Sequence, residues 1–137
     1  MTLEIIDAPS DRLIAEIAQK IDDFNHERWE VKEKVPLVIV RRNAAGELEA
    51  AASAKTFGLW LLIDILWIDP SLQGQGVGAK MLGEMERIAI GRGCQFALLD
   101  TLNFQARPFY EKFGYRVEWT QPQYPREGCK YFMVKTL

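Results

Sequence analysis

The chain has 137 residues, of which 48% are apolar and 26% charged, and its formal net charge is -2. These proportions are those of an ordinary globular protein, so we expect one domain spanning residues 1–137. The lack of a basic excess argues against nucleic acid as a partner, and no apolar run is long enough for a membrane span. Because the chain starts without a signal-peptide pattern, we expect a cytoplasmic protein with Cys94 and Cys129 reduced.

The first part of the chain alternates between strand-like and helix-like apolar spacing. In chain order the pattern predicts a strand at 3–6, a helix at 13–24 capped by Ser10, a short second helix at 25–34, and a hairpin of strands at 37–40 and 50–56.

Residues 61–90 are predicted to form a buried strand, a glycine-rich turn and an amphipathic helix. The strand is an almost unbroken apolar run that only Asp64 interrupts, and a period of two places Asp64 on the same face as Leu62 and Leu66. A buried carboxylate at that position needs a partner or a function. Asp64 is therefore a candidate functional residue.

The remaining residues continue the alternation of strands and helices. The pattern predicts a buried strand at 96–99, a helix at 106–113 and a closing antiparallel pair at 117–119 and 131–134. The order strand, helix, strand across residues 61–99 predicts that its two strands are parallel.

The turn between the central strand and helix contains Gly74, Gly76 and Gly78. Amides that open a helix lack intrahelical partners, and glycines let a ligand approach the backbone, so the turn suits a bound phosphate. Its spacing fits neither the dinucleotide-binding fingerprint nor the P-loop. Taken alone, the turn is explained equally well by close packing of the helix.

Two motifs together resemble a known family. Gln73-Gly74-Gln75-Gly76-Val77-Gly78 is similar to the first signature of the GNAT superfamily of acetyl-CoA-dependent N-acetyltransferases, and the segment from Asn103 to Tyr115 resembles the second signature. The clear resemblance covers residues 63–119 and points to a small, single-domain bacterial branch. It implies an α/β fold with a central twisted, mostly antiparallel sheet of about six to seven strands, a splayed parallel pair at its centre and about four helices on both faces.

The resemblance also assigns roles to residues. It implies acetyl-CoA as co-substrate, without a metal, and Tyr110 as the general acid near the sulfur. The alternative for Tyr110 is aromatic packing against Phe109 and Phe113, and the motif match favours the acid. It implies that Asn103, otherwise a plain helix cap, contacts the pantetheine arm. The implied coenzyme contacts are Leu66, Trp67 and Ile68 on the strand, and Gln73, Gly74, Gln75, Gly76, Val77, Gly78 and Ala79 at the turn.

The general base is less clearly marked. Asp64 is the first candidate, although a structural carboxylate is an equal alternative, and Asp100 and His26 are weaker candidates. Cys94 lies between a helix-ending glycine and a buried strand, so we expect it in the core and expect direct transfer without an acyl-enzyme.

The predicted function is transfer of an acetyl group from acetyl-CoA to a primary amine in a ternary complex. The alternatives are a catalytically inactive acyl-CoA-binding or sensor module, and a purely structural domain. The acceptor amine is not indicated, because the segments that shape it, the N-terminal helices and residues 121–128, are the least family-like. Tyr124 and Tyr131 in the closing strands leave a homodimer as an open alternative.

Overall fold

The computed structural model describes residues 1–137, which divide into two compact units, residues 1–32 and residues 33–137. The first unit contains one helix, α1 (Asp11–His26). The Ser10 hydroxyl accepts a hydrogen bond from the Leu13 amide at 3.1 Å, which confirms the predicted N-cap. The apolar side chains of α1 at Ile14, Ile17 and Ile21 are exposed.

Two elements predicted in this part of the chain are absent. Residues 3–6 form no strand, because a strand requires a neighbouring strand to pair its backbone groups and these residues pair with none. Residues 27–34 contain a turn and a bend instead of a second helix. That segment is polar and offers no apolar face that a helix could bury.

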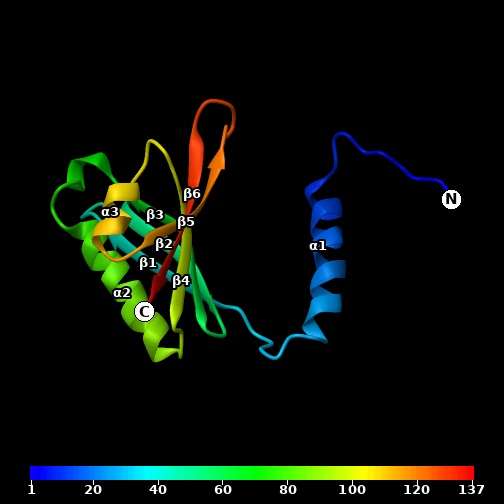
Figure 1. The fold of residues 1–137 in the computed structure, drawn as a ribbon, viewed down its shortest axis with the longest axis horizontal. Helices are drawn as coiled ribbons and strands as arrows, with labels where there is room; N and C mark the ends of the chain where they lie inside the picture. Colours follow the sequence, from blue (N-terminus) through cyan, green and yellow to red (C-terminus); the bar gives the residue numbers. More distant parts are fainter. The chain divides into compact units, whose positions relative to one another are not determined.

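The second unit is a six-stranded sheet with two α-helices (Figure 1). Its elements are β1 (Val35–Arg42), β2 (Leu48–Phe57), β3 (Trp60–Ile68), the 3-10 turn η1 (Pro70–Leu72), α2 (Val77–Gly91), β4 (Phe96–Leu102), α3 (Arg107–Lys112), β5 (Arg116–Pro122) and β6 (Cys129–Thr136). The strands lie in the order β1-β2-β3-β4-β6-β5. All neighbours are antiparallel except β3 and β4, which confirms the predicted fold class and its central parallel pair. The chain has three α-helices where about four were predicted, because residues 27–34 form no helix.

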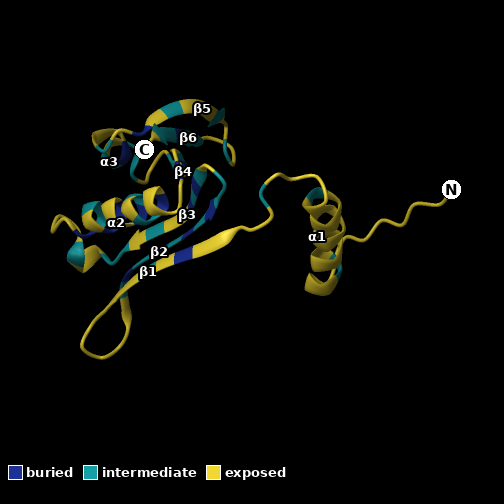
Figure 2. Ribbon diagram, turned by 90° about the horizontal axis from the view of Figure 1, so that it is seen from below, coloured by how far each residue is buried: buried dark blue, intermediate teal, exposed yellow.

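The core lies between α2 and one face of the sheet (Figure 2). The largest fully buried side chains are those of Leu61, Leu82, Met85 and Met133, and each buried side chain of this size contributes about 1.5–3 kcal/mol. Cys94 is buried and unpaired as expected. α3 lies on the same side of the sheet as α2 (Figure 1).

The two helices approach each other closely at Gly78. A Cβ atom at that position would lie 3.3 Å from the Phe109 ring, so the absence of a side chain permits the contact. None of the three α-helices combines the length and apolar character required to cross a membrane.

Candidate functional site

The central parallel pair of the sheet opens into a slot. β3 and β4 pair only at three positions, Trp60 with Phe96, Leu61 with Ala97 and Leu62 with Leu98. Beyond Leu62, β3 continues to Ile68 with its other edge still paired to β2, so the edge that faces β4 has no ladder partner. Unpaired strand edges offer a row of amide and carbonyl groups to an extended ligand.

A β-bulge at Asp64 lies where the slot begins. On β2, Ala54 is opposite Ile63 and Ser53 is opposite Ile65, so Asp64 has no partner. The extra residue interrupts the alternation of faces, because Asp64 and Ile65 are both exposed whereas Leu66 packs against the core. The prediction that Asp64 shares a face with Leu66 is therefore wrong.

Asp64 is also not the buried carboxylate that the apolar run suggested. Half of its side chain is exposed, and its Oδ1 lies 3.6 Å from the Nζ of Lys55 on β2. An exposed ion pair of this kind contributes less than about 1 kcal/mol to stability. Because the Asp64 carboxylate is half exposed and paired with Lys55, its presence in the strand requires no functional explanation. It nevertheless lines the cavity, within reach of a ligand.

The turn between β3 and α2 leaves the first amides of α2 open. Gly76, the N-cap, is left-handed at φ +79°, and Gly74 is left-handed at φ +80°. No side chain caps the helix, and its first turn carries no acidic residue. The unpaired amides and the positive end of the helix dipole together favour an anion at this position.

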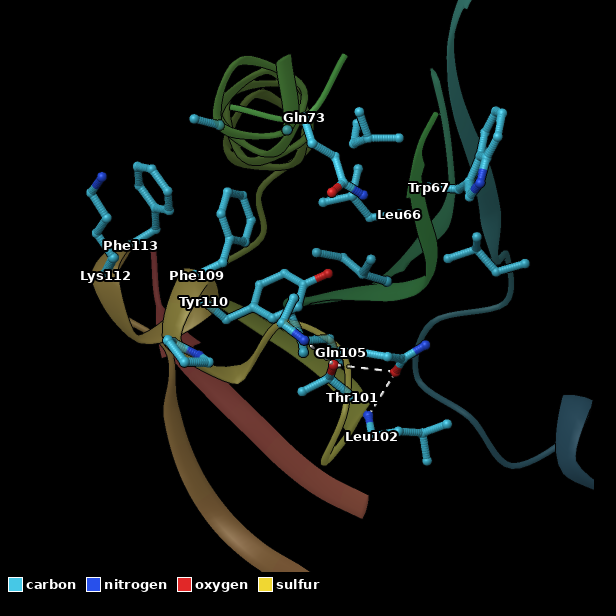
Figure 3. Close-up of a pocket in the computed structure, with 18 of the residues that line it drawn as sticks. Leu66, Trp67, Gln73, Thr101, Leu102, Gln105, Phe109, Tyr110, Lys112 and Phe113 are labelled. Atoms are coloured by element: carbon cyan, nitrogen blue, oxygen red, sulfur yellow. Dashed lines mark hydrogen bonds between the residues drawn. The ribbon is translucent and has the colours of Figure 1, made fainter. Parts of the chain in front are cut away.

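The slot and this turn enclose one cavity of about 1050 Å³ (Figure 3). The predicted site residues that line it are Asp64, Leu66, Trp67, Ile68, Gln73, Gly74, Gly76, Val77, Gly78, Ala79 and Tyr110. Gln75 and Asn103 do not line it. The Gln75 side chain donates to the Ser71 carbonyl at 3.3 Å, and the side-chain oxygen of Asn103 accepts from the Cys129 amide at 3.1 Å.

Tyr110 extends from α3 into the centre of the cavity, with its hydroxyl directed away from the helix (Figure 3). The rings of Phe109 and Tyr115 contact it edge to face, with centroids 5.2 and 5.8 Å away, and hold its orientation. Burial raises the pKa of the Tyr110 phenol, and the negative charge of Asp100 raises it further. The hydroxyl therefore stays protonated at neutral pH and can act as a proton donor.

A hydrogen-bonded cluster next to Tyr110 connects α2 to Tyr115 and to β6. Glu86 on α2 accepts one bond from the Tyr115 hydroxyl and one from Lys135 on β6, both at 2.8 Å. Burial, the hydrogen bond to Glu86 and the Glu86 charge all raise the pKa of Tyr115. The cluster therefore links the helix that opens the cavity to the strand behind Tyr110 in a fixed geometry.

The cavity is also lined by polar and aromatic side chains that were not predicted as site residues, among them Phe104, Gln105, Lys112, Tyr124 and Lys130. Gln105 lies inside the second motif, and its position there is the sequence feature that could have predicted its place in the cavity. Tyr124 lies in residues 121–128, which were predicted to shape the acceptor site, and Lys130 follows on β6. Their place beside β4 depends on the pairing of β6 with β4, which local sequence does not reveal. No group of three or more His, Cys, Asp and Glu side chains is arranged to hold a metal ion.

Comparison with known proteins gives consistent matches. Residues 4–115 match the sequence model of the acetyltransferase (GNAT) family. The blasticidin-S acetyltransferase of Streptomyces morookaense is 32% identical over 114 residues, which cover 80% of this chain and 84% of that protein. The crystal structure of an acetyltransferase from Bacillus cereus superposes with a TM-score of 0.84 at 28% identity, covering 98% of both chains. An aminoglycoside 6'-N-acetyltransferase solved with coenzyme A shares the fold, with a TM-score of 0.65 at 16% identity and coverage of 96% and 97%.

Proposed function

Because the chain belongs to the GNAT family of acetyltransferases, we propose that it transfers the acetyl group of acetyl-CoA directly to an amine while both substrates are bound. The observation that carries this proposal is the unpaired edge of β3. That edge and the open amides of α2 line the same cavity as the Tyr110 hydroxyl. A ligand bound along it would have its phosphate end at a helix terminus and its reactive end beside a proton donor.

The residues of the cavity fit coenzyme A. The amides of Val77, Gly78 and Ala79 would hold the pyrophosphate, and a Cβ atom at Gly76 would meet nothing within 4 Å, so the approach to the turn is open. The edge of β3 from Leu66 to Ile68 would pair with the amide groups of the pantetheine arm in the manner of an added strand.

Acetyl-CoA supplies an activated acetyl group and a sulfur leaving group. A backbone amide of the open β3 edge would donate to the carbonyl oxygen as negative charge develops on it. Tyr110 would give its proton to the departing sulfur, which requires the protonated phenol that its raised pKa maintains. Asp64 would receive the proton of the attacking amine, directly or through a water, from its position at the entrance of the slot.

The relative that is 32% identical is named for blasticidin S, so this compound is the first acceptor to test. Spermidine, an aminoglycoside and a short peptide with a free N-terminus extend the panel to other amines. Release of the CoA thiol from acetyl-CoA, measured with a chromogenic disulfide, reports transfer to any of them.

Tyr110→Phe keeps the aromatic ring and removes only the hydroxyl. We expect it to lower kcat by on the order of 10²-fold while CoA binding, measured by calorimetry, is retained. If the unaltered protein binds CoA but acetylates no amine in the panel, the binding-module alternative is favoured. If it binds neither CoA nor acetyl-CoA at millimolar concentration, the proposed function is wrong.

A further inference from the structure

One wall of the cavity comes from the connection between β5 and β6 and from the start of β6. Tyr124 and Lys130 both line the cavity, and the Lys130 ammonium lies 4.3 Å from the centroid of the Tyr124 ring. The connection is closed on itself, because the Tyr124 amide donates to the Gly128 carbonyl at 2.9 Å. We name these two side chains the β5–β6 wall.

Asn103 fastens the β5–β6 wall to the end of β4. Its backbone amide donates to the Cys129 carbonyl at 3.0 Å, and its side-chain oxygen accepts from the Cys129 amide at 3.1 Å. The Asn103 side chain can lie this close to the connection only because residue 128 is a glycine. A Cβ atom at Gly128 would lie 2.6 Å from the Asn103 side-chain oxygen and 2.8 Å from the Tyr124 carbonyl.

The segment that carries Asn103 is itself fixed. Gln105 accepts from the Leu102 amide at 2.6 Å and from the Thr101 hydroxyl at 3.3 Å, which closes the turn before α3 (Figure 3). The Ala106 amide in turn donates to the Thr101 hydroxyl at 3.4 Å. Asn103 therefore connects the β5–β6 wall to the same turn that begins the helix carrying Tyr110.

We propose that Asn103 is a positioning residue for the acceptor, which acts by holding the β5–β6 wall and not by contact with the coenzyme. This inference rests on the proposed function. Asn103 does not line the cavity, and its oxygen is already engaged by the Cys129 amide. The surfaces that suit coenzyme A belong to β3 and α2, whereas the wall belongs to β6 and the connection before it, and β4 separates β6 from β3 in the sheet.

The chemistry of the wall also suits an acceptor. The Tyr124 ring offers a flat apolar face, and no carboxylate lies within 4.0 Å of the Lys130 ammonium, which leaves that cation able to meet a carbonyl or anionic group of a ligand. Asp64 and Asp100 line the same cavity and suit the cationic amine. The acceptor class that fits both the β5–β6 wall and the two carboxylates is an amine that also carries a polar oxygen group and a flat apolar portion.

The test compares two variants at one position. Asn103→Ala removes the acceptor of the Cys129 amide, and Asn103→Asp retains an oxygen for it. We expect Asn103→Ala to raise the acceptor KM by about threefold to tenfold and to leave the acetyl-CoA KM within about twofold, and Asn103→Asp to restore most of the acceptor KM. Gly128→Ala, whose Cβ would clash with both the Asn103 side chain and the Tyr124 carbonyl, should displace the wall directly and raise the acceptor KM at least as much as Asn103→Ala.

Two readouts need no turnover and therefore separate this inference from the proposed function. Asn103→Ala should speed deuterium exchange in residues 124–129, and calorimetry with CoA alone should give an unchanged Kd. Weaker CoA binding in Asn103→Ala, or unchanged exchange in residues 124–129, would overturn the inference whether or not an acceptor has been identified. Once an acceptor is known, an unchanged acceptor KM would also overturn it.

Discussion

The first turn of α2 leads to a prediction in which stability and ligand binding change in opposite directions. Ala79 is the third residue of the helix, whose first turn has neither an acidic residue nor a side-chain cap. A glutamate at this position would face unpaired amides and the positive end of the helix dipole. Ala79→Glu should therefore stabilise the folded protein by about 0.3–1 kcal/mol.

The same carboxylate would oppose a pyrophosphate bound at these amides. Two like unit charges about 4 Å apart near a protein surface repel by about 4 kcal/mol, and half of that already weakens binding by more than tenfold. We therefore expect CoA affinity to fall by at least about tenfold in Ala79→Glu while its resistance to urea stays equal or rises.

Ala79→Gln is the matched control, because glutamine has the size of glutamate without its charge. Calorimetry with CoA at low and high salt should show that Gln binds more tightly than Glu and that salt narrows the difference, because screening weakens the repulsion. Urea unfolding of the same proteins measures the stability change. If the Glu and Gln variants bind CoA equally at low salt, no pyrophosphate binds at the start of α2 and the reasoning fails.

Three further predictions concern the Tyr110 phenol, the Asp64 carboxylate and the hydrogen bonds of Glu86. A general acid must be protonated, so activity should fall as pH rises through the pKa of Tyr110, which lies above the ordinary value of 10. Asp100→Asn should move this fall in activity to lower pH, because it removes the negative charge that raises the Tyr110 pKa. Identical pH–rate profiles for the parent and Asp100→Asn would exclude this electrostatic effect. Asp64→Asn should lower kcat by on the order of 10²-fold at neutral pH, and an unchanged rate and pH dependence would refute its role as base. Glu86→Gln should cost on the order of 2 kcal/mol of unfolding free energy in a urea titration, because Glu86 accepts two partly buried donors; the exposed Glu84→Gln is the control, and an equal loss there would contradict this explanation.

Much of the cavity could be predicted from residues 61–90 and 103–115. A continuous apolar run, a glycine turn and a periodic helix are each determined by neighbouring residues, so β3, the turn and α2 follow from local sequence. The second motif likewise predicted α3 and the place of Tyr110 in the cavity. Local signals were sufficient wherever the element forms its own hydrogen bonds or buries a clear apolar face.

The rest depends on contacts between distant segments. The bulge at Asp64 exists only relative to its partner strand β2, so a period of two assigned the wrong face. The bond from Cys129 to Asn103 requires β6 to lie beside β4, with Lys130 opposite Leu102. Residues 3–6 have the composition of a strand but no strand to pair with. In each case the missing information was the identity of a neighbour far away in the chain.

The bulge in β3 also bears on how such a cavity can arise. Because two successive residues, Asp64 and Ile65, are exposed, we expect a chain shortened by residue 64 to keep Ile63, Leu66 and Ile68 on their present face, toward the core. It would lose the local bend that a bulge imparts, and the free edge of β3 could continue its pairing with β4. We therefore expect a deletion of residue 64 to unfold like the parent protein in urea yet to bind CoA poorly. One extra residue in β3 would then account for the free strand edge that lines the cavity.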